Sequence, residues 1–81
     1  MKVISVTYLC SFSDEVSVSA EVFPTKEQAH EYINNEKATL QEDYPNWSVV
    51  EESDDILVFG TENYENFVEF KITEHELNGK N

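Results

Sequence analysis

The chain has 81 residues, and its 17 Asp and Glu residues against five Lys and no Arg give a formal net charge of −12. This length is enough for one small domain but not for a deep substrate groove, and the charge disfavours direct binding to nucleic acid or to anionic lipid. The content of 40% hydrophobic and 12% aromatic residues is too high for a disordered acidic tail. We therefore expect a single folded domain over residues 1–81, with no direct nucleic-acid or membrane contact.

Two alternating segments open the chain. Residues 3–10 are rich in β-branched side chains with a period of two, which predicts a strand. After a turn at residues 11–14, apolar residues alternate with Glu and Ser over 15–22, a pattern typical of a strand with one buried face. We predict a β-hairpin in which the polar side chains of the second strand face away from the core. These are Glu15, Ser17, Ser19 and Glu21.

A helix is predicted next. Thr25 is suited to cap its first amides, Gln28 occupies the matching capping-box position, and Pro45 ends the helix near Asp43. Glu36 interrupts the apolar arc, where its carboxylate must reach solvent, find a donor or face a partner. The arc itself consists of Ala29, Tyr32, Ile33, Leu40 and Tyr44.

The second half of the chain predicts three more strands. Residues 47–50 and 56–59 flank an acidic tip at 51–55, and residues 67–73 alternate again before a frayed tail at 74–81. The order ββαβββ indicates an α+β, two-layer domain in which an antiparallel sheet of about five strands carries one amphipathic helix on one face. The other face must be solvated or meet a partner. Besides the polar residues of the second strand, it is expected to carry Glu69, Lys71 and Thr73.

Catalytic chemistry is not indicated. His30 and His75 are expected on the surface, and Cys10 on an apolar strand face is expected to be a structural thiol. Two glycines form no phosphate-binding loop. We therefore expect no enzymatic activity and no cofactor. The lone cysteine and the absence of a signal-peptide pattern at the N-terminus favour the cytoplasm.

The acidic tip is the first candidate binding site. Its carboxylates belong to Glu51, Glu52, Asp54 and Asp55, and they are interpreted as a solvated turn, a partner-docking tip or a Ca²⁺ or Mg²⁺ site. A calcium-binding loop would space its ligands at alternate positions around a Gly, so no metal is assigned. Trp47, which follows Tyr44 and Pro45 and opens a strand, is interpreted as a core residue beneath the C-terminal end of the helix, with a binding hot spot as the alternative.

The charge leads to two functional hypotheses. In the first, Glu27, Glu31 and Glu42 on the outer helix face act with the tip as a DNA mimic that occupies the nucleic-acid groove of a basic protein partner. This is the physical type expected of a phage or mobile-element inhibitor of anti-restriction or anti-CRISPR kind, although no family-specific motif is present. The alternative is a generic protein-interaction or assembly module that uses an exposed strand edge or sheet face. The charge would then serve solubility. A third possibility is that the acidity is an adaptation to a saline cytoplasm.

Overall fold

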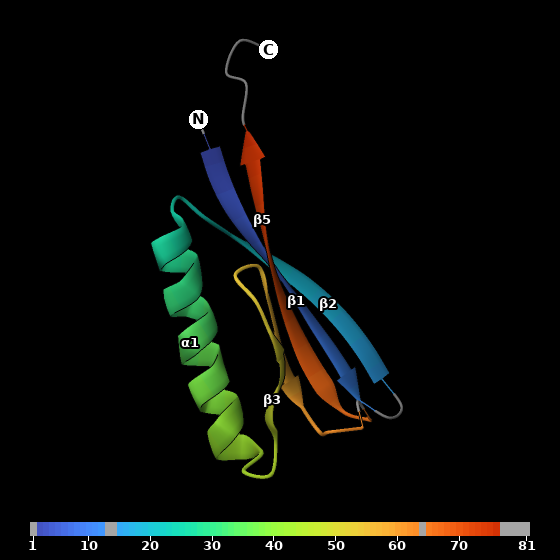
Figure 1. Ribbon diagram of the computed structural model, residues 1–81. Coiled ribbons are helices and arrows are strands. Elements are labelled where there is room, and N and C mark those ends of the chain that lie inside the picture. Colours follow the sequence, from blue (N-terminus) through green and yellow to red (C-terminus); the bar gives the residue numbers. More distant parts are fainter. Residues whose placement is uncertain (1, 13–14, 64, 77–81) are drawn as a thin grey trace.

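The computed structural model describes residues 2–12, 15–63 and 65–76, and these form one antiparallel five-stranded sheet with a single helix on one face (Figure 1). The predicted α+β two-layer class and the ββαβββ chain order are therefore confirmed. The elements are β1 (Lys2–Phe12), β2 (Glu15–Phe23), α1 (Lys26–Asp43), β3 (Ser48–Glu52), β4 (Ile56–Gly60) and β5 (Phe67–Glu76).

The last strand joins the two hairpins into one sheet. The spatial order is β2-β1-β5-β4-β3, so β5 pairs with β1 on one side and with β4 on the other. β5 extends to Glu76, three residues into the segment predicted as a tail, because the first residues of β1 offer it backbone partners from Lys2↔Glu76 to Ile4↔Glu74. The side chains of Lys2 and Glu74 also form an ion pair at 3.8 Å. Residues 77–81 of the predicted tail lie outside the described residues.

The helix begins and ends where the sequence predicts. The amide of Gln28 donates to the Thr25 hydroxyl oxygen at 3.2 Å, and the amide of Tyr44 donates to the Leu40 carbonyl at 2.7 Å. These bonds satisfy backbone groups that the helix itself leaves unpaired. The buried stripe of α1 packs on the central strands, whose fully buried side chains are Val6, Phe59, Val68 and Phe70.

Trp47 closes the core below the C-terminal end of α1, as predicted. It is 7% exposed, stacks on Tyr44 with ring centroids 4.2 Å apart, and lies 5.9 Å from the ring of Phe12. The aromatic rings therefore seal the end of the two layers where the chain leaves the helix and enters β3.

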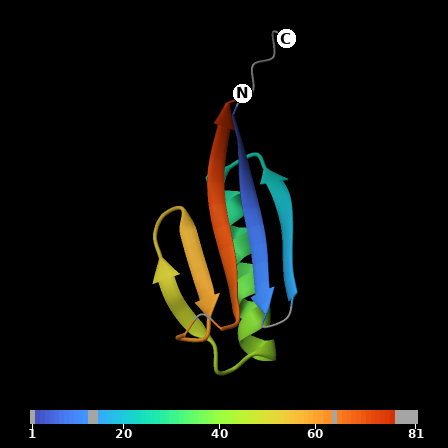
Figure 2. The same cartoon turned by 90° about the vertical axis from the view of Figure 1, so that its right-hand side faces the viewer.

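The second strand differs from its prediction. Val16, Val18 and Val22 are 64%, 62% and 64% exposed. The register pairs Val18 with Leu9 and Leu9 with Glu69, and cross-strand partners share a face, so the valines lie on the open face opposite α1. Figure 2 shows this face, with β2 at one edge of the sheet and α1 behind it.

The prediction that the polar side chains of β2 face away from the core layer was therefore wrong. They lie on the helix side of the sheet, where all four are exposed. The hairpin register explains the reversal, because Phe12 packs on Trp47 on the helix side and Glu15 is its cross-strand partner. Glu69, Lys71 and Thr73 do lie on the open face, as predicted, beside the valines.

Candidate functional site

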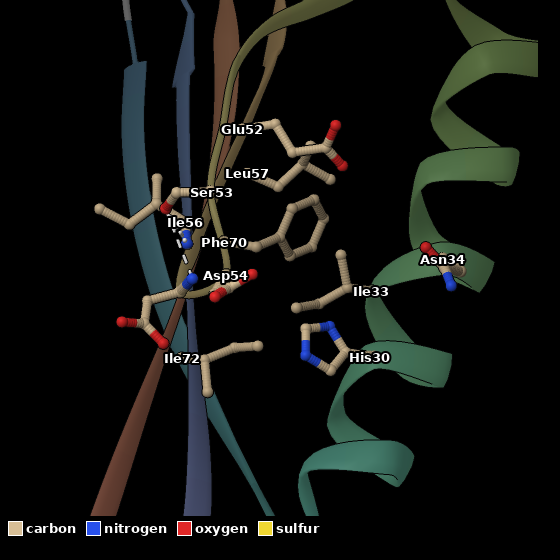
Figure 3. A pocket seen from close by; sticks show the side chains of 11 residues that line it. His30, Ile33, Asn34, Glu52, Ser53, Asp54, Ile56, Leu57, Phe70 and Ile72 are labelled. Carbon is tan, nitrogen blue, oxygen red and sulfur yellow. Dashed lines mark hydrogen bonds between the residues drawn. The ribbon is translucent and has the colours of Figure 1, made fainter.

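A cleft of 340 Å³ opens between α1 and the turn that joins β3 to β4 (Figure 3). Its floor is apolar and belongs to the core. Its rim is polar, with His30 and Asn34 on the helix and the acidic tip on the sheet. Four side chains from the helix and the central strands make the floor: Ile33, Leu57, Phe70 and Ile72.

The acidic tip is held in one conformation by backbone contacts. The Ser53 amide donates to the Ile56 carbonyl at 2.8 Å, and the Ser53 hydroxyl oxygen accepts from the amide of Ile56 at 3.2 Å. The Ile72 amide donates to the Asp55 carbonyl at 2.7 Å, which ties the tip to β5. The tip is therefore a structured turn and not a loose loop.

The tip carboxylates do not share one surface. Glu52 pairs with Leu57, whose side chain forms the cleft floor, and the carboxylates of Glu52 and Asp54 extend toward α1 (Figure 3). Asp55 also lines the cleft. Glu51 pairs instead with Val58 and belongs to the open face of the sheet. A carboxylate rim above an apolar floor suits a cationic side chain with an apolar stem.

The carboxylates of α1 lie on another surface. Glu27, Glu31 and Glu42 are all exposed. At about 100° per residue they fall within an arc of about 60°, on the side of α1 opposite the buried Ala29 and Leu40. We call these three residues the outer acidic face of α1. The structure does not bring them together with the tip carboxylates that point into the cleft.

The side chains of His30 and Lys37 on α1 are separated from the outer acidic face. His30 lines the cleft, and Lys37 lies on the same flank of the helix, about 20° away at about 100° per residue. Glu52 and Asp54 of the tip therefore face the flank of α1 that carries these side chains. The carboxylates of the outer acidic face have no lysine within their arc. Their negative charge is therefore less compensated than that of the tip carboxylates that face the cleft.

Glu36 lies half-buried on α1, one helical turn from Tyr32. Besides burial, the interaction between these two side chains contributes to the raised pKa of Tyr32. Burial raises the pKa of Tyr32, and the charges of Glu36 and Glu21 add to this shift. Burial also raises the pKa of Tyr8 far above its ordinary value, together with a hydrogen bond to the Cys10 side chain. Sequence patterns miss this group because its members come from β1, β2 and α1.

The raised pKa values of Tyr8 and Tyr32 predict a loss of stability in alkali. The unfolded chain releases these protons near pH 10, whereas the folded chain keeps them to higher pH. Their contribution to the free energy of unfolding is therefore complete below about pH 10 and is lost as the pH rises above it. Urea denaturation between pH 8 and pH 11 should show a steeper fall for the wild type than for the double variant Tyr8→Phe/Tyr32→Phe. Parallel curves would contradict this account.

The other candidate residues have structural surroundings. His30 and His75 are exposed, and the half-buried Cys10 packs against the core, as predicted. His75 Nε2 lies 2.9 Å from the Ser5 hydroxyl on the open face. Within residues 2–12, 15–63 and 65–76, no three His, Cys, Asp or Glu side chains are grouped so as to hold a metal ion. The one helix of this part of the chain is not apolar enough to cross a membrane.

Comparison of the chain with protein-family models, with curated proteins and with solved structures found no match.

Proposed function

We propose that this chain is a non-enzymatic, cytoplasmic, acidic domain that binds the basic surface of another protein, with the outer acidic face of α1 as the main contact. The observation that carries the proposal is the segregation of charge on α1. Glu27, Glu31 and Glu42 span about 22 Å of helix with no lysine among them on that face. They project from a regular, capped helix, so the backbone holds their Cα atoms in a row.

The partner chemistry follows from this row. Arg and Lys side chains that cradle a nucleic-acid backbone are spaced to meet successive negative charges, and a row of carboxylates on a rigid helix offers similar charges. The net charge of −12 extends the negative potential beyond the contact and speeds association with a cationic groove. We propose a nucleic-acid mimic that inhibits a basic nucleic-acid-binding protein, of the type used by phages and mobile elements against restriction or CRISPR nucleases.

A second function is favoured by a separate observation. The exposed valines of β2 lie on an edge strand, where an assembly module would add a strand from a partner. The two functions respond differently to salt. Charge docking weakens as ionic strength rises, because counterions screen the carboxylates, whereas strand addition through backbone hydrogen bonds and valines persists.

Two charge-matched variants test the proposed contact. The first carries Glu27→Gln, Glu31→Gln and Glu42→Gln on α1, and the second carries Glu52→Gln, Asp54→Asn and Asp55→Asn at the tip. Each removes three negative charges. Immobilised wild type and variants are exposed to a lysate of the source cells or their host, and washed at about 50 mM and about 300 mM NaCl, where the screening length differs more than twofold.

The proposal predicts that the wild type and the tip variant retain a basic nucleic-acid-binding protein at low salt, and that the α1 variant retains at least tenfold less of it. High salt should release the protein from all three. Retention by the α1 variant, with loss from the tip variant, would transfer the contact to the cleft and contradict the role of the outer acidic face. Equal loss from both variants would mean that only total charge matters.

A further inference from the structure

The edge strand β2 is open to pairing with another strand. Its register with β1 continues without a bulge from Phe12↔Glu15 to Ile4↔Phe23. No Pro or Lys occurs within residues 15–23, although such residues commonly block the edges of natural sheets. The exposed stripe of Val16, Val18 and Val22 runs along the same strand.

The opposite edge of the sheet is protected. β3 has only five residues, and its register with β4 shifts between Val49 and Glu51. A short and irregular strand discourages pairing. Figure 2 shows the two edges on either side of the sheet, with α1 behind the strands and no helix or strand of the described residues beyond β2. The sheet therefore has one blocked edge and one open edge.

We propose that β2 pairs antiparallel with β2 of a second copy of this chain, around a twofold axis at Ser19. The sequence of β2, Glu-Val-Ser-Val-Ser-Ala-Glu-Val-Phe, is nearly self-complementary in this register. Val16 lies opposite Val22 of the second copy, and Val18 lies opposite Ala20. All these side chains fall on the open face, so two apolar stripes meet side by side and the two sheets become one continuous sheet.

The charges of β2 also select this register. With Ser19 at the axis, Glu15 lies opposite Phe23 of the second copy and Glu21 lies opposite Ser17, so no like charges face each other directly. Moving the axis to Val18 would place Glu15 opposite Glu21 in both halves, and like charges directly opposite destabilise a strand pair. The Ser19 register is also the one that pairs all nine residues of β2.

Salt should strengthen this dimer. Each copy carries a net charge of −12, and Glu21 approaches Glu15 of the second copy diagonally, so screening removes repulsion while the valine contacts and backbone hydrogen bonds remain. The pairing is a specific form of the assembly function proposed above. It uses no residue of the outer acidic face, so failure of the dimer leaves charge docking intact, and failure of charge docking leaves the dimer intact.

Cysteine cross-linking tests the register. In a Cys10→Ala background, Ser19→Cys places two thiols opposite each other across the axis. Facing residues of antiparallel strands have Cα atoms about 4.5–5.5 Å apart, which a disulfide can bridge. The matched control is Ser17→Cys, which is exposed on the same face of the same strand but lies opposite Glu21 in this register. Sedimentation velocity of the wild type at rising NaCl measures the dimer itself.

The expected mean mass rises from 9.4 kDa toward twice that value as NaCl increases. Ser19→Cys should form a disulfide-linked dimer at least tenfold faster than Ser17→Cys, with both variants folded by circular dichroism. A wild type that stays monomeric at every salt and protein concentration would overturn the proposal. Equal rates of cross-linking for the two variants would also overturn it. The same holds if the β2 edge pairs with a different protein and never with itself.

Discussion

Replacing Phe70 with Ala is expected to unfold most of the protein. The Phe70 side chain is fully buried in the central strand β5, stacks edge-on against Tyr8 at a centroid distance of 4.8 Å, and forms part of the cleft floor. Phe-to-Ala changes in a core cost about 3–5 kcal/mol, because they remove apolar burial and leave a cavity. A single core of this size supplies a net stability of roughly the same magnitude. Circular dichroism during urea denaturation measures the change.

A valine on β2 gives the matched control for this substitution. Val16→Ala also shortens an apolar strand residue, but Val16 is 64% exposed on the open face. At protein concentrations that keep the chain monomeric, the change should alter the free energy of unfolding by about 0.5 kcal/mol or less. Equal losses for Phe70→Ala and Val16→Ala would contradict the assignment of β2 to an exposed edge.

Replacing Gly60 with Ala is expected to have the second largest effect. A Cβ atom at Gly60 would overlap the Asn66 carbonyl oxygen and lie 2.6 Å from the Cα of Phe67. Both are backbone atoms, one in the connection and one in the first residue of β5, and they cannot turn aside as a side chain can. The Asn66 carbonyl also accepts a hydrogen bond of 2.9 Å from the Thr61 amide, so moving it disturbs the turn.

The expected loss for Gly60→Ala is about 1–3 kcal/mol, the usual cost of forcing extra atoms into a packed site. The control in the same connection is Glu62→Ala, because Glu62 is exposed and its change should cost about 0.5 kcal/mol or less. A shift in urea midpoint for Gly60→Ala that is no larger than for Glu62→Ala would show that the backbone around residues 66–67 relaxes freely.

The helix and the core under it could be predicted because their signals are local. Thr25 caps the first turn, Pro45 limits the last, and the 3.6-residue period places Ala29, Ile33 and Leu40 on one side. The buried position of Trp47 could be predicted because this residue comes soon after the end of the helix. These signals depend on neighbours in the chain, so the sequence alone contains them.

The orientation of β2 could not be predicted from its own pattern. Alternation of valines with Glu and Ser shows that the strand has two unlike faces, but it does not say which face meets the helix. The packing of Phe12 on Trp47 decides that choice through the hairpin register. The burial of the β2 valines was also predicted wrongly. The single helix covers only one face of the sheet, and the valines of this edge strand lie on the other face.

The candidate site was predictable by residue type but not by arrangement. The carboxylates of the tip and of α1 are evident from residue type, yet their grouping depends on strand register and on the direction of the turn. Glu51 and Glu52 are adjacent in sequence and lie on opposite faces of the sheet. The helical pattern left the surroundings of Glu36 open, and the structure places this residue half-buried near Tyr32.

A competition measurement tests charge docking most directly. The basic protein retained by the wild-type domain is bound to fluorescent nucleic acid, and anisotropy is followed as the wild type or the Glu27→Gln/Glu31→Gln/Glu42→Gln variant is added. The account predicts that the wild type displaces the nucleic acid and that the variant needs at least tenfold higher concentration to do so. A ternary complex, in which the domain binds and the nucleic acid remains, would contradict the assignment of the outer acidic face as a nucleic-acid mimic.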